Sequence, residues 1–137
     1  MSAIKEHIIH NYAEAPQPTH ENVIVDGVHR YPPTGLKVLV VGGGPGGYLT
    51  AVECWRKGHQ VELVEKNSNN TPIGLASMLY DQCERLGIKV TFGVNVLSYV
   101  ENATEGTATA IADDGRQFTA DIVVAADGLG TKSHQVV

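Results

Sequence analysis

The spacing of hydrophobic positions changes twice between residues 36 and 65. Residues 36–41 are almost continuously apolar, which is typical of a strand buried on both faces. Apolar residues then recur at helical spacing through Tyr48, Val52 and Trp55, and residues 61–65 form a second short apolar run. This order predicts a strand, a helix and a second strand, which together form a βαβ unit of a parallel sheet.

A glycine-rich turn joins the first predicted strand to the helix. Gly42, Gly44 and Gly47 have the spacing at which the first glycine permits a tight turn, the second leaves room for a pyrophosphate, and the third lets helix and strand pack closely. Pro45 suits the first helical turn because its missing N–H has no partner there in any case. The free amides and the positive end of the helix dipole then favour phosphate groups.

An acidic residue stands where a ribose-binding carboxylate is expected. Glu65 ends the second predicted strand, 23 residues after Gly42, which is close to the separation of about 20 at which a carboxylate accepts hydrogen bonds from ribose hydroxyls. A glutamate there favours an adenosine ribose without a 2′-phosphate. The alternative is a nucleotide-free sheet in which the glycines only turn the chain.

The pattern after Glu65 predicts a further helix and several more strands. A polar linker at 66–72 precedes a helix over 73–86 that ends at Gly87, with Leu75, Met78, Leu79 and Cys83 on its inward face. A third strand follows at 88–92. Short strands at 94–100, 107–112 and 117–120 predict an antiparallel meander, and the apolar run 121–126 predicts a parallel strand beside the first one.

Residues 1–35 are predicted to form an N-terminal arm, and residues 36–137 a single nucleotide-binding-like domain. In the arm, Ile4, Ile8 and Tyr12 share one face of a short helix, and Asp26-Gly27 between β-prone residues predicts a two-residue hairpin. We expect the arm to pack over the nucleotide domain. The fold class is therefore α/β: a Rossmann-like βαβ parallel sheet with an antiparallel β-meander crossover, preceded by the arm.

Composition and charge narrow the function classes. The chain has 137 residues, 42% of them hydrophobic, and a formal charge of −5 with no basic run, which argues against partners such as nucleic acid or an anionic membrane. It shows no signal peptide and no stretch long enough to span a membrane, so a cytoplasmic location is expected.

The metal-ligating and thiol residues do not form an evident site. Cys54 and Cys83 lie on separate predicted helices, so we expect reduced thiols and no disulfide. His7 and His10 are three residues apart on the predicted N-terminal helix, but no third ligand is nearby, so we assign no metal.

The ordered set of motifs resembles a known family. Over about residues 36–134, the chain resembles FAD-dependent monooxygenases of the aromatic-hydroxylase type (class A), fungal ones above all. The resemblance rests on the strand, turn and helix at 36–58, on Glu65, on the meander and on the segment 120–128. The resemblance implies FAD as cofactor. It also implies that Asp127 and Gly128 form the second fingerprint, near the FAD pyrophosphate and the path of the nicotinamide donor, and that the backbone near Val96 contacts adenine. Taken alone, Asp127-Gly128 is an ordinary turn after a strand.

Several parts of the family pattern have no counterpart in this sequence. The link after the second strand is short, and Pro72, Ile73 and Gly74 stand where the family has a phosphate-anchoring arginine. The Asp-Gly motif continues to Thr131 and His134 in place of a serine and an arginine. The third fingerprint, the substrate sheet and the C-terminal helices are also missing. The resemblance therefore implies that this chain holds at most the ADP end of FAD.

Three functions follow as alternatives. The first is the FAD-binding module of a flavin-dependent monooxygenase-like protein, not competent alone for hydroxylation with O₂ and with NADPH as a transient donor. The second is a shortened relative repurposed as a non-redox enzyme of the isomerase, cyclase or pericyclase type, which acts on an apolar secondary metabolite in a cleft roofed by the arm. Its candidate polar groups are Tyr12, His10, Arg30 and Tyr31. The third is a ligand-free interaction subunit. No catalytic residue is assigned, and the surface left by the missing parts predicts a homodimer or a partner chain.

Overall fold

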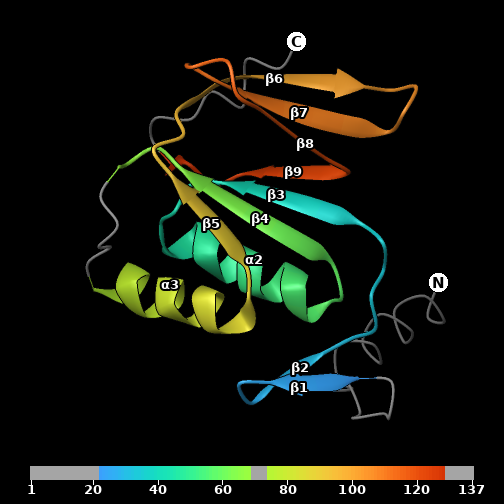
Figure 1. Ribbon diagram of the computed structural model, residues 1–137, viewed down its shortest axis with the longest axis vertical. Helices are drawn as coiled ribbons and strands as arrows, with labels where there is room; N and C mark the ends of the chain where they lie inside the picture. The colour runs from blue at the N-terminus through green and yellow to red at the C-terminus, as the bar shows by residue number, and fades with distance from the viewer. Residues whose placement is uncertain (1–21, 69–73, 129–137) are drawn as a thin grey trace, which may run out of the picture.

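The computed structural model describes residues 22–68 and 74–128 of the chain. Figure 1 shows a central sheet with two helices on one face and a second, smaller sheet on the other. The predicted helix of the arm, with His7, His10 and Tyr12, lies outside the described residues, as do Thr131 and His134.

The central sheet has the strand order β5-β4-β3-β9, and all its pairs are parallel. Its strands are β3 (Lys37–Val41), β4 (Gln60–Glu65), β5 (Lys89–Phe92) and β9 (Ile122–Ala125). Side chains alternate between the two faces of β3, so Val38 and Val40 enter one core while Leu39 and Val41 enter another. The expected position of the last parallel strand beside the first is confirmed.

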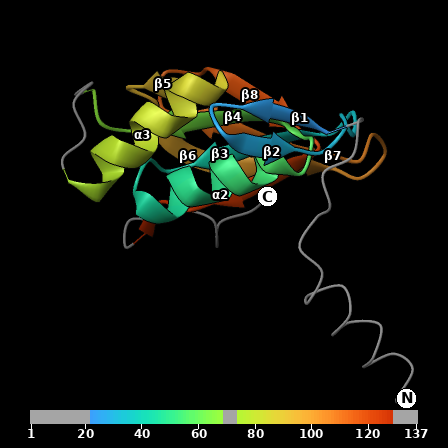
Figure 2. The ribbon, with the colours of Figure 1, turned by 90° about the horizontal axis from the view of Figure 1, so that it is seen from below.

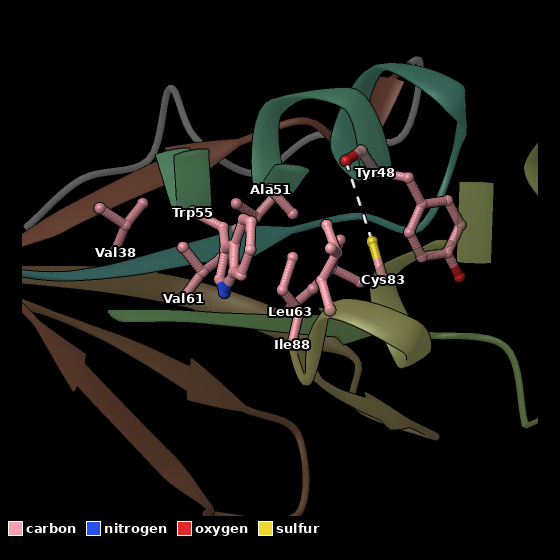
Figure 3. Packing of buried hydrophobic residues seen from close by; sticks show 10 residues of the cluster. Val38, Tyr48, Ala51, Trp55, Val61, Leu63, Cys83 and Ile88 are labelled. Atoms are coloured by element: carbon pink, nitrogen blue, oxygen red, sulfur yellow. Dashed lines mark hydrogen bonds between the residues drawn. The ribbon is translucent and has the colours of Figure 1, made fainter. Parts of the chain in front are cut away.

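Helices α2 (Pro45–Arg56) and α3 (Leu75–Leu86) cover one face of this sheet. Their core contains Tyr48, Ala51, Trp55 and Cys83, which pack against the strands in Figure 3. The expectation that Leu75 and Met78 point inward is wrong, since these side chains are 56% and 68% exposed. Leu79 and Cys83 do face the core, as expected, in a buried stripe on the side of α3 away from Leu75 and Met78. Its members are Ala76, Leu79, Tyr80, Cys83 and Leu86.

The predicted meander covers the opposite face. It consists of β6 (Val96–Asn102), β7 (Thr107–Ala112) and β8 (Gln117–Ala120), paired antiparallel in that order. Leu39, Val41 and Val64 from the central sheet pack against residues of the meander that include Tyr99 and Ala110. The meander occupies the crossover between β5 and β9, so β9 returns to the parallel sheet beside β3.

The described part of the arm is a hairpin of β1 (Val23–Val25) and β2 (Val28–Arg30). Asp26 and Gly27 both have positive φ, +50° and +75°, as the predicted two-residue turn requires. The Arg30 guanidinium stacks on Trp55 and donates to the carbonyl oxygens of Trp55 and His59 at 3.0 and 2.9 Å. These contacts hold the hairpin at the C-terminal end of α2 (Figure 2).

This placement bears on the idea that the arm roofs a cleft. The glycine turn lies at the N-terminal end of α2, whereas Tyr31 donates its backbone N–H to Arg56 at the other end. Arg30 and Tyr31 are therefore committed to the far end of the helix, and the described part of the arm does not roof the glycine turn. The α/β fold with a parallel sheet and an antiparallel meander is confirmed, while the division at residues 35 and 36 stays a prediction.

Candidate nucleotide-binding site

The C-terminal ends of β3, β4 and β9 meet at one edge of the sheet, which is where parallel α/β sheets bind ligands. A cleft of about 70 Å³ lies there, on the meander side. It is lined by Val41, Gly42, Val64, Glu65, Lys66, Val94, Asn95, Val96 and Asp127. Four residues expected at a cofactor site, from four separate stretches of sequence, are thus brought together: Gly42, Glu65, Val96 and Asp127.

Gly42 and Gly47 are required by close packing. Gly42 has φ +118°, and a Cβ atom there would lie 2.4 Å from the carbonyl oxygen of Ala126. A Cβ atom on Gly47 would lie 1.8 Å from the carbonyl oxygen of Gly42. The first glycine therefore lets β3 turn beside the end of β9, and the third lets α2 start directly above that turn.

Gly44 has a different environment from the other two glycines. It is the N-cap of α2 with φ −85° and ψ 178°, an extended conformation open to any residue, and a Cβ atom there would meet nothing within 4 Å. Gly46 also faces open space. No side chain caps this helix end, and its first turn carries no acidic residue. The first-turn amides are therefore available to an anion, and no side chain obstructs the N-terminus of the helix.

Glu65 reaches from the end of β4 to the glycine turn. Its Oε1 accepts a hydrogen bond from the Gly43 amide at 3.0 Å, and its Oε2 accepts one from the Asn67 amide at 3.1 Å. Two backbone donors therefore fix the carboxylate at the cleft, and the remaining lone pairs are left for other donors such as ribose hydroxyls. In this structure one amide of the glycine turn is already bound to a carboxylate of the protein itself.

Asp127 and Gly128 follow β9 directly. The Ala126 amide donates to the Val41 carbonyl oxygen at 2.7 Å, which carries the chain across the end of β3. Asp127 Oδ1 is buried and has no hydrogen-bond partner among the described residues, and a buried carboxylate oxygen is costly without a donor. Burial and, next, the charge of Asp127 raise the pKa of Tyr99 to about 12. Gly128 has φ +66°, so the segment is a turn, and the Asp127 carboxylate lines the cleft.

Lys66 and Asn95 line the cleft as well, and the sequence patterns did not single them out. Lys66 directly follows the ribose-binding candidate, and Asn95 lies at the start of the meander, where no motif marks it. Lys66 contributes the kind of charge that a phosphate requires.

The cysteines are free thiols, as expected: Cys83 is buried and Cys54 half-buried. Burial raises the pKa of Cys83 to about 11, and burial followed by the charge of Glu53 raises the pKa of Cys54, so both stay protonated at neutral pH. Within residues 22–68 and 74–128 no three His, Cys, Asp or Glu side chains gather as a metal site. None of the helices in that part of the chain has the length and apolarity to cross a membrane.

A parallel sheet, a glycine turn opening a helix, and a carboxylate at the end of the next strand define a dinucleotide-binding α/β domain. The chain belongs to the pyridine nucleotide-disulphide oxidoreductase family, whose family model matches residues 9–136.

The chain is similar to fungal FAD-dependent monooxygenases. The FAD-dependent monooxygenase fsr3 of Gibberella fujikuroi is 29% identical over 182 aligned positions, which cover 80% of this chain and 35% of that protein. The chain thus spans about a third of the length of this relative. Since the alignment is longer than the 137 residues of the chain, the relative carries residues within the aligned region that have no counterpart here.

Solved structures with the same fold include an FAD complex and a Diels-Alderase. FqzB is 24% identical with a TM-score of 0.68 over 74% of this chain and 38% of its own, and CtdE in complex with FAD is 23% identical with a TM-score of 0.63 over 70% and 39%. The Diels-Alderase PyrE3 of pyrroindomycin biosynthesis is 14% identical with a TM-score of 0.59 over 67% and 32%. The expected family resemblance is confirmed, and FAD is the cofactor that these comparisons support.

Proposed function

We propose that this chain binds the ADP half of FAD and is the FAD-binding module of a flavin-dependent monooxygenase-like protein. The observation that carries the proposal is the cleft itself, where Gly42, Glu65, Val96 and Asp127 converge from separate elements. The uncapped N-terminus of α2 offers amide donors to a phosphate, and the partnerless Asp127 Oδ1 at the cleft can accept from a hydroxyl group, so both fit a bound dinucleotide.

Each group has a distinct role in this proposal. The first-turn amides of α2 bind the pyrophosphate, with Gly44 leaving room for it. Glu65 accepts hydrogen bonds from the ribose hydroxyls, and the backbone near Val96 lies against adenine. Asp127 and Gly128 lie near the pyrophosphate. Bound FAD supplies the redox chemistry, whereas these residues supply binding and orientation.

The module is not competent alone for hydroxylation with NADPH and O₂. The chain spans about a third of the monooxygenase fsr3, and oxygen chemistry on a flavin needs a site from which water is excluded. We therefore expect a homodimer or a partner chain to complete any such site, and we expect a cytoplasmic location. Leu75 and Met78, 56% and 68% exposed on α3, are apolar surface suited to such a contact. Light scattering coupled to size exclusion measures the assembly, and a monodisperse monomer contradicts it.

The test of cofactor binding is the visible spectrum of the purified protein, followed by calorimetric titration with FAD and with ADP. We expect binding of both ligands, because the site contacts only their shared half. Glu65→Gln is the matched variant, and it should weaken ADP binding by about tenfold, the value of one lost charge-assisted hydrogen bond. ADP carrying a 2′-phosphate should bind weakly to the unchanged protein, since two negative groups would meet at Glu65. No binding of FAD or ADP would contradict the proposal.

The fold of PyrE3 supports a second candidate function. That neighbour is a Diels-Alderase, so the same fold serves a reaction other than hydroxylation. The candidate is a non-redox conversion of a small apolar substrate by a shortened relative. A colourless protein that binds neither FAD nor ADP but binds apolar small molecules would favour it. Arg30 and Tyr31 are not available for this role, since they bind the C-terminal end of α2.

A further inference from the structure

Tyr48 carries a hydroxyl group that the fold itself does not use. The side chain lies in the first turn of α2 and is fully buried, 0% exposed. Figure 3 shows the ring extending from α2 past Cys83, and it packs against Tyr80 of α3 with ring centroids 6.1 Å apart. The hydroxyl has no hydrogen-bond partner within the described part of the chain. A buried hydroxyl without a partner is destabilising, whereas a phenylalanine would pack without that penalty.

The Tyr48 hydroxyl lies at the glycine turn, beside Glu65. A Cβ atom built on Gly43 would stand 3.0 Å from the Tyr48 hydroxyl oxygen and 3.0 Å from Cγ of Glu65. The phenol and the Glu65 side chain therefore flank the same point. Burial and, next, the charge of Glu65 raise the pKa of Tyr48 to about 12, so the phenol keeps its proton at neutral pH and can act as a donor.

Glu65 is the acceptor beside this donor, but it is bound elsewhere. Its Oε1 accepts from the Gly43 amide at 3.0 Å. Gly43 directly precedes the N-cap of α2, so this amide belongs to the stretch of backbone that would face a pyrophosphate. A phosphate oxygen that reaches the turn competes with the carboxylate for the amide. The displaced carboxylate oxygen then needs another donor.

We propose that Tyr48 is a positioning residue of the nucleotide site: on binding, the Glu65 carboxylate exchanges the Gly43 amide for the Tyr48 hydroxyl. The exchange leaves the amide to a phosphate oxygen and holds the carboxylate beside the ribose. The hydroxyl is unpaired in the free protein and paired in the complex, so it contributes to affinity and not to the free fold. This inference rests on the proposed function, because it requires a bound adenine dinucleotide.

The experiment is a double-mutant cycle on ADP and FAD affinity with Tyr48→Phe and Glu65→Ala. Tyr48→Phe should weaken the binding of both ADP and FAD by about tenfold, which corresponds to about 1.4 kcal/mol. The free variant should melt at the same temperature as the unchanged protein or higher. In the Glu65→Ala background, Tyr48→Phe should have no further effect, because the acceptor is gone. Tyr80→Phe is the matched control. The Tyr80 ring packs against Tyr48, and its hydroxyl donates to Glu84, so removing that hydroxyl should leave nucleotide affinity unchanged.

The outcomes separate this inference from the proposed function. If the unchanged protein binds ADP and Tyr48→Phe binds it equally well, the role of Tyr48 is overturned and the function stands. The role of Tyr48 is overturned in the same way if the losses of Tyr48→Phe and Glu65→Ala simply add. If the unchanged protein binds neither ADP nor FAD, the proposed function is overturned, and the inference with it. In a supporting result, ADP also shifts the amide NMR signal of Gly43 in the unchanged protein.

Discussion

Adding one methyl group at Gly44 and one at Gly47 should have opposite consequences, although the two residues belong to the same motif. At Gly44 the new Cβ atom would meet nothing within 4 Å, and the backbone is already extended. At Gly47 the new Cβ atom would lie 1.8 Å from the Gly42 carbonyl oxygen, so the backbone has to move. Gly44→Ala therefore tests the ligand, and Gly47→Ala tests the fold.

The expected magnitudes follow from these environments. Alanine is a poorer N-cap than glycine by about 1 kcal/mol. It also restricts the unfolded chain, which stabilises the folded state by roughly 0.4–1 kcal/mol. Because the two effects nearly cancel, Gly44→Ala should leave the free energy of unfolding nearly unchanged. Gly47→Ala should lower it by about 3 kcal/mol, since overpacking against backbone cannot relax through a rotamer change. The corresponding fall in Tm is about 10 °C for a chain of this size.

Urea unfolding and FAD titration on both variants provide the test. Gly44→Ala should keep the urea midpoint of the unchanged protein and lose FAD affinity by at least about tenfold, because its methyl group occupies the space reserved for the pyrophosphate. If Gly44→Ala is stable and binds FAD as well as the unchanged chain, the dinucleotide does not lie on the glycine turn, and the site described above is misplaced.

Two further predictions concern stability. Arg30→Ala should lower the free energy of unfolding by about 2 kcal/mol in urea titrations, since it removes the hydrogen bonds to the Trp55 and His59 carbonyl oxygens and the stacking on Trp55. FAD affinity should stay the same. A loss of affinity without a loss of stability would contradict a purely structural role for Arg30. Burial raises the pKa of Tyr48 and of Tyr99 from 10.0 to about 12, so the unfolded chain loses these protons first, and stability should be fully present below pH 10 and fall as the pH rises toward 12. Tyr99→Phe should make this fall shallower in pH-dependent melting curves, and an unchanged slope would argue against burial as the cause.

Much of the fold was predictable because its signals are local and agree with one another. The βαβ unit follows from a change of hydrophobic period at Gly42, and the hairpin follows from Asp26-Gly27. The apolar Ile-Val-Val-Ala run predicted the parallel placement of β9 beside β3, although β9 lies at the edge of the sheet and its residues are exposed or half-buried.

Other features depend on contacts that no local pattern encodes. Leu75 and Met78 fit a helical stripe, but the stripe that α3 buries is set by its rotation against α2 and β5, so both side chains are exposed. The docking of the hairpin at the C-terminal end of α2 depends on hydrogen bonds from Arg30 to Trp55 and His59, which lie 25 and 29 positions later in the chain. The four cleft residues were predictable singly from motifs and resemblance, but the bond between Glu65 and Gly43 and the unpaired hydroxyl of Tyr48 required coordinates.

The attachment of the hairpin at one end of α2 also has a practical consequence. A helix of 12 residues is about 18 Å long, so the β1–β2 turn stands well away from the cofactor cleft. A surface-exposed attachment point on this hairpin would immobilise the protein on a sensor chip with its cleft directed toward the flowing solution. Kinetic measurements of nucleotide capture on such a chip would then be free of steric interference from the support.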